Sequence, residues 1–155
     1  MTDVRFYHLQ QKRLEEALPE LVGKALEKKH RILVKSSTKE RVEALDGVLW
    51  SFDPASFIPH SAQQDGTEKD QPVFLTTEEG NPNGATVLIL TGGASADDLG
   101  PFALCCDMFD GNDEQAVDAA RARWKQYKDK GHGVEYWQQD DSGKWQKKET
   151  QKQQG

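Results

Sequence analysis

The segment RILVK, Arg31–Lys35, decides the fold class of this 155-residue chain. It places three apolar residues between two bases, which is typical of a short strand buried on both faces. Before it, the apolar residues of positions 14–26 recur at helical spacing and predict an amphipathic helix that ends at His30. After it, Ser37 or Thr38 can cap a second helix. A buried strand between two helices indicates an α/β sheet.

The same alternation continues on both sides of this unit. Asn112 or Asp113 can cap a third helix that runs to Lys130, with Gly131 as its C-cap. We therefore predict a three-layer α/β domain with a largely parallel or mixed sheet flanked by helices. Short apolar or aromatic runs predict the other strands at Val4–Leu9, Pro72–Thr76, Ala85–Thr91, Ala103–Phe109 and His132–Gln138.

The length of the chain favours one domain, which we assign to residues 1–140. Residues 141–155 are expected to form a polar C-terminal extension that is partly frayed. No run approaches the roughly 18 consecutive apolar residues of a membrane span, and the N-terminus lacks the pattern of a signal peptide. We therefore expect a cytoplasmic protein that does not bind membranes, with Cys105 and Cys106 as small buried residues.

The charge is distributed unevenly. The net charge of −6 argues against strong direct binding of nucleic acid by the whole surface. From Asp65 to Glu114 there are eleven acidic residues and one base, whereas Arg121–Lys130 holds five bases and one acid. An acidic protein with one local basic stripe suits an acidic peptide better than a long phosphate backbone.

No catalytic or cofactor motif emerges from the sequence. The loop TGGAS, Thr91–Ser95, follows a predicted strand, but it lacks the GK[ST] ending of a phosphate-binding loop. The alternative function is a small nucleotide-binding α/β enzyme that uses this loop, although glycines at a tight strand exit are the commoner explanation. None of the four histidines has metal-ligand spacing. We expect no enzyme activity, no catalytic residue, no cofactor and no metal.

The segment LDGVLWSFDPASFIPH carries large apolar residues past the end of the second predicted helix into a proline-bounded loop. Trp50, Phe57 and Ile58 are the candidates for a contact with a partner protein. Such aromatic residues either complete the core or form an exposed patch, and an exposed patch usually marks an interface.

The end of the third predicted helix, ARARWKQYKDKG, forms a second candidate site. Arg121, Trp124, Lys125 and Lys128 are spaced at i, i+3, i+4 and i+7, so they share one helical face. A basic helical face is most often simply solvated. The interleaved tryptophan favours a different hypothesis, in which the bases bind carboxylates and the indole binds the aromatic residue that ends an acidic peptide.

These segments, taken together, resemble the chi subunit family of bacterial DNA polymerase III. The resemblance runs from FYHL near the start to Trp137, in the same order and at similar spacing. Its marks are Phe6–Tyr7, RILVKSSTKE, the LW…SFIPH stretch and the ARARWKQYKDKG helix end.

The resemblance implies a Rossmann-like fold without nucleotide binding, and two binding surfaces in place of an active site. The surface with Trp50, Phe57 and Ile58 would bind a psi subunit or an equivalent clamp-loader partner. A helicase can compete for the same surface. The helical face with Arg121 and Trp124 would bind the acidic, phenylalanine-ended tail of single-stranded-DNA-binding protein. The chain would then be a non-catalytic adaptor of the polymerase III holoenzyme in DNA replication.

Two positions depart from the family pattern. Well-known members carry tyrosine where this chain has Trp124, and they can carry lysine where it has Val117.

A third possible function is direct binding of single-stranded DNA, since an aromatic residue among bases can also stack on nucleobases.

Overall fold

The computed structural model describes residues 2–10, 13–51, 72–96, 98–139 and 145–151. These residues form an α/β domain, as the sequence predicts. The elements are, in chain order, β1 (Asp3–Leu9), α1 (Leu14–Glu27), β2 (Ile32–Lys35), α2 (Lys39–Ser51), β3 (Val73–Thr76), β4 (Val87–Leu90), β5 (Leu104–Asp110), α3 (Glu114–Asp129), β6 (Gly133–Gln139) and β7 (Trp145–Gln151).

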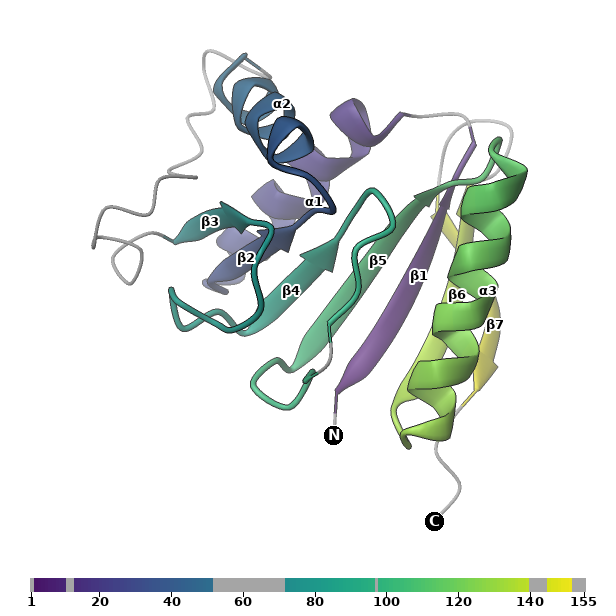
Figure 1. Cartoon of the computed structure of the whole chain (residues 1–155). Coiled ribbons are helices and arrows are strands. Elements are labelled where there is room, and N and C mark those ends of the chain that lie inside the picture. The colour runs from purple at the N-terminus through teal and green to yellow at the C-terminus, as the bar shows by residue number, and fades with distance from the viewer. Residues whose placement is uncertain (1, 11–12, 52–71, 97, 140–144, 152–155) are drawn as a thin grey trace.

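One sheet with the strand order β3-β2-β4-β5-β1-β6-β7 forms the centre of the domain (Figure 1). All neighbouring strands pair in parallel except β6 and β7, which are antiparallel. In the view of Figure 1, α1 lies behind this sheet, α2 stands above the end formed by β2 and β3, and α3 crosses the front. Side chains of α1 and α2 share one core. The three layers and the largely parallel sheet confirm the predicted Rossmann-like fold class.

Each face of the sheet has its own apolar core. One core joins α1 and α2 to side chains such as Val34, Leu75 and Ile89. The other core lies beneath α3 and includes Phe6 and Tyr127. β2, β3 and β4 are buried along their whole length, and each begins with at least three consecutive apolar residues. This is why the RILVK segment could be recognised as a strand buried on both faces.

The helix ends follow the chemistry that the sequence indicates. The hydroxyl of Thr38 accepts a hydrogen bond from the backbone N–H of Arg41 at 3.2 Å. The Asp113 carboxylate accepts one from the backbone N–H of Gln115 at 3.0 Å and so caps α3. Gly131, just past the end of α3, has a φ of +88°, which glycine adopts without strain. None of the described helices is long and apolar enough to span a membrane.

The C-terminal segment differs from the sequence-based expectation. Trp145–Gln151 forms the strand β7, which the sequence did not predict and which pairs with β6 at the edge of the sheet. Trp145 packs edge-on against Tyr7, with the ring centroids 4.9 Å apart. Polar residues can form such an edge strand because the ladder hydrogen bonds come from the backbone, and one aromatic anchor fixes the register.

The Thr91–Ser95 loop is a tight turn that depends on glycine. Gly92 has a φ of +60°, and a Cβ added there would lie 2.9 Å from Cδ of Arg41 and 3.0 Å from Oγ of Ser36. The backbone N–H of Ala94 donates to the carbonyl of Thr91 at 3.0 Å and closes the turn.

Gly92→Ala is therefore expected to lower the free energy of unfolding by roughly 1–2 kcal/mol, since a left-handed backbone and a steric contact combine. The matched control is Gly23→Ala in α1, where an added Cβ meets no atom within 4 Å. This control should stabilise the protein by roughly 0.5–1 kcal/mol. Denaturant unfolding measures both changes, and equal effects of the two variants would contradict this account of the loop.

Candidate functional site

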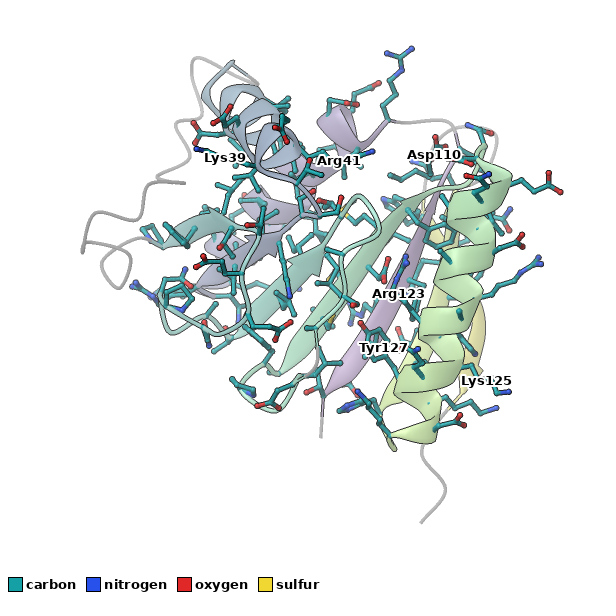
Figure 2. The ribbon with its side chains drawn as sticks, viewed as in Figure 1. Lys39, Arg41, Asp110, Arg123, Lys125 and Tyr127 are labelled. Carbon is teal, nitrogen blue, oxygen red and sulfur yellow. The ribbon has the colours of Figure 1, made fainter. Side chains whose placement is uncertain are left out.

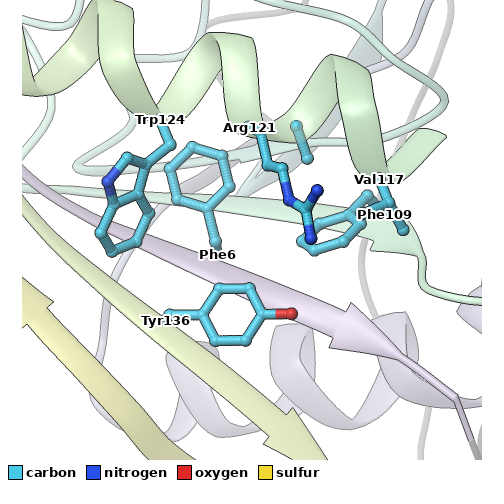
Figure 3. Close-up of a pocket in the computed structure, with 7 residues that line it drawn as sticks. Phe6, Phe109, Val117, Arg121, Trp124 and Tyr136 are labelled. Atoms are coloured by element: carbon cyan, nitrogen blue, oxygen red, sulfur yellow. The ribbon is translucent and has the colours of Figure 1, made fainter. Parts of the chain in front are cut away.

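A pocket of about 350 Å³ opens between α3 and the strands beneath it. Three strands and one helix supply its walls: β1, β5 and β6 form the floor, and α3 forms one side (Figure 3). The pocket is apolar apart from one cation and one hydroxyl. Its lining residues are Phe6, Phe109, Val117, Ala120, Arg121, Trp124 and Tyr136.

The pocket lies along the border between the buried and the half-exposed side chains of α3. Ala120, Arg123 and Tyr127 are buried against the sheet. Trp124 lies at the border of this inward face, where it is half-buried beside Phe6, with ring centroids 5.4 Å apart. The indole of Trp124 therefore forms a wall of the pocket and remains accessible to a ligand.

Arg121 places a positive charge at the pocket. Its side chain is 79% exposed and forms an ion pair with Asp118 at 3.9 Å. Such an exposed pair contributes little, so the guanidinium can exchange it for a stronger anion. In Figure 3 the guanidinium of Arg121 and the hydroxyl of Tyr136 lie toward one end of the pocket, and the indole of Trp124 lies toward the other.

The four residues predicted on this helical face do not all reach the pocket. The structure brings Arg121 and Trp124 to it. Lys125 and Lys128 are exposed on α3 and are not part of the pocket lining. Lys125 extends away from the sheet (Figure 2), so these two lysines can meet only those parts of a ligand that continue along the helix.

Sequence reasoning missed the residues that the strands contribute. Tyr136 comes from β6, Phe109 from β5 and Phe6 from β1. Burial raises the pKa of the Tyr136 hydroxyl, and the nearby Arg121 opposes this shift. The hydroxyl is therefore neutral at physiological pH and can donate a hydrogen bond.

Arg123, next to Trp124, has a structural role. Its Nε and Nη2 donate to the two carboxylate oxygens of Asp107 at 2.6 and 3.0 Å (Figure 2 labels Arg123). Both side chains are buried, with 8% and 2% of their surface exposed. Burial raises the pKa of Asp107, and the hydrogen bonds from Arg123 oppose that shift. This ion pair joins α3 to β5.

The second predicted site falls mostly outside the described residues. Trp50 belongs to the last turn of α2, but its side chain is not described. Phe57 and Ile58 lie in the range that the structure does not describe. The assignment of these three residues to a partner surface stays a prediction.

A larger and more polar pocket of about 580 Å³ lies at the carboxyl ends of the strands, where the Thr91–Ser95 loop contributes Gly92 and Gly93. Open α/β sheets often bind ligands at this edge. Three arginines line the pocket together with three carboxylates, so its charge does not favour an anion. These side chains are Arg13, Arg41 and Arg123, and Glu15, Asp110 and Asp113.

Metal and thiol chemistry gain no support from the described part of the chain. No three His, Cys, Asp or Glu side chains there are grouped so as to hold a metal ion. Cys105 and Cys106 are free but buried. Burial raises the pKa of the Cys106 thiol to about 12, so it is not a reactive thiolate at neutral pH.

Comparison with known proteins identifies the family. The model of the family "DNA polymerase III chi subunit, HolC" matches residues 1–135, which include most of the sheet and all three helices. A curated relative, "Probable DNA polymerase III subunit chi" of Rickettsia prowazekii (strain Madrid E), is 28% identical over 90 residues. That alignment covers 58% of this chain and 54% of the relative, so the chain spans about half the length of that relative. From the family match, this chain belongs to the DNA polymerase III chi subunit family.

Proposed function

We propose that the protein is a non-catalytic accessory subunit of DNA polymerase III that acts as an adaptor in DNA replication. In this proposal, the pocket on α3 binds the acidic C-terminal tail of single-stranded-DNA-binding protein. The observation that carries the proposal is an apolar pocket with one cation, Arg121, beside its aromatic wall, Trp124. Family membership supports the role in replication.

The size of the pocket fits one aromatic side chain better than a cofactor. Ligand pockets of proteins range from about 300 to 1,000 Å³, and this pocket is near the lower limit. Its aromatic neighbours lie at ring distances of 5.4 Å (Phe6–Trp124) and 6.3 Å (Trp124–Tyr136). A third ring can join such a cluster edge-on or with an offset. Val117 extends the apolar wall.

The charges around the pocket favour an acidic peptide. A terminal carboxylate can bind the Arg121 guanidinium, and preceding acidic residues can lie near the exposed Lys125 and Lys128. The remainder of the protein is acidic, with a net charge of −6, so it would repel a long nucleic acid.

The other half of the adaptor is a clamp-loader partner. We propose that Trp50, Phe57 and Ile58 bind a psi subunit or its equivalent, and that a helicase can use the same surface. The sequence supports this assignment, because large apolar residues continue past α2 into a proline-bounded segment.

The proposal can be tested by calorimetric titration of the whole protein with a short acidic peptide that ends in phenylalanine. Replacing that phenylalanine by alanine should weaken binding about tenfold or more, because burial of the ring contributes roughly 1.5–3 kcal/mol. A matched oligonucleotide should not displace the peptide. Equal affinity for the two peptides, or displacement by the oligonucleotide, would contradict the proposed function.

A further inference from the structure

A histidine lies directly behind the pocket. His8 is on β1, two residues after Phe6, so both side chains lie on the α3 face of the sheet. The His8 ring is 5.1 Å from the ring of Phe109 and 5.7 Å from that of Tyr136, centroid to centroid. Its Nδ1 is hydrogen-bonded to the hydroxyl of Tyr136. The histidine is 9% exposed, so it acts on a ligand through Tyr136.

The direction of this hydrogen bond decides what Tyr136 offers to a ligand. A tyrosine hydroxyl has a single hydrogen. If that hydrogen points to Nδ1 of His8, only oxygen lone pairs face the pocket, and they repel a carboxylate. If Nδ1 carries a hydrogen and donates to the tyrosine oxygen, the hydroxyl hydrogen of Tyr136 is free to donate to a carboxylate. The charged imidazolium always has a hydrogen on Nδ1, whereas the neutral ring has it in only one tautomer.

The groups around His8 keep it neutral when the pocket is empty. Burial is the largest effect and lowers the pKa of His8, and Arg121 on α3 lowers it further. Asp110 at the end of β5 and the backbone of Gly111 act in the opposite direction. A ligand carboxylate bound at Arg121 would offset the charge of that guanidinium and so favour protonation of His8.

We propose that His8 is a positioning residue that couples binding of an acidic ligand to proton uptake, by turning the Tyr136 hydroxyl into a donor for the ligand carboxylate. This inference rests on the proposed function, because it assigns the ligand carboxylate to the end of the pocket where Arg121 and Tyr136 meet. Figure 3 shows the guanidinium and the hydroxyl at that end. By linkage, affinity for the peptide should rise as the pH falls through the pKa that His8 has in the complex, toward its lower pKa in the free protein.

The test is a calorimetric titration of the full-length protein with the acidic, phenylalanine-ended peptide at several pH values between 8 and 6. Even pH 6 is about two units above the pKa of the peptide carboxylates, so the peptide stays ionised throughout. Wild-type affinity should increase roughly threefold or more over this range, below the limit of tenfold per pH unit for one proton. His8→Leu should lose this increase, because leucine has no group that takes up a proton in this pH range. His8→Asn places an amide N–H, which does not depend on pH, where it can donate to the Tyr136 oxygen. This variant should bind the peptide at pH 8 at least as tightly as wild type, and its affinity should not change with pH.

Two controls keep the test decisive. Tyr136→Phe removes only the hydroxyl, so it should also lose the pH dependence, even if the leucine variant folds poorly. His132→Gln changes a histidine whose pKa is also lowered by burial but which packs beside Tyr127, outside the pocket lining. It should keep the wild-type pH profile. The same pH profile in wild type and Tyr136→Phe would overturn the inference while leaving the proposed function intact, whereas no binding by the wild type at any pH would overturn both.

Discussion

Replacing Arg123 with alanine is expected to lower the free energy of unfolding by about 3–5 kcal/mol. The change would leave the Asp107 carboxylate, whose side chain is 2% exposed, without its two charge-assisted hydrogen bonds. Because domains of this size are stable by only about 5–15 kcal/mol, the loss is a large fraction of the total. Denaturant unfolding followed by circular dichroism measures it.

The matched control is Arg121→Ala, two residues earlier on the same helix. The Arg121 side chain is 79% exposed, so its removal should change stability by no more than about 0.5 kcal/mol. The double variant Arg123→Met with Asp107→Leu should recover most of the lost stability, since it removes both buried charges. If Arg123→Ala were as stable as Arg121→Ala, the ion pair between α3 and β5 would not stabilise the fold.

Arg121→Ala is expected to weaken binding of the acidic peptide about tenfold or more. A charge-assisted hydrogen bond contributes roughly 1.5–3 kcal/mol, and about 1.4 kcal/mol corresponds to a factor of ten. Arg121→Lys should recover only part of the affinity, because lysine lacks the planar group that grips a carboxylate at two points. Trp124→Ala should also weaken binding by removing an apolar wall. Calorimetric titration with the short peptide measures all three variants.

Lys128→Ala is the control for general charge effects, since Lys128 is exposed and does not line the pocket. Its effect on affinity should be small and should decrease further in high salt. Binding of a clamp-loader partner should be unchanged in all of these α3 variants. An Arg121→Ala protein that is folded and binds the peptide as tightly as wild type would show that this helical face is only solvated.

The fold class could be predicted because its signals are local. Buried parallel strands are continuous apolar runs, and helix starts carry capping residues such as Thr38 and Asp113. β7 could not be predicted in the same way. Its sequence WQKKETQ is polar, and its place in the sheet depends on backbone pairing with β6 and on the packing of Trp145 against Tyr7.

The candidate site could be predicted only on its helical side. Arg121 and Trp124 are one turn apart, so the sequence alone places them together. The floor of the pocket comes from strands that are far apart in the sequence, since Phe6 and Tyr136 meet only because β1 and β6 are neighbours in the sheet. The role of Arg123 was hidden for the same reason, because its partner Asp107 lies in the middle of an apolar strand.

Binding of the acidic peptide at Trp124 can be observed by a nuclear magnetic resonance titration of the whole protein with that peptide. The four tryptophans of the chain give separate indole N–H signals, and the Trp124 signal can be assigned with a Trp124→Phe variant. We expect this signal to shift on binding, while those of Trp137 and Trp145, which pack on the opposite face of the sheet, stay in place. An unchanged Trp124 signal at saturating peptide would contradict binding at this pocket.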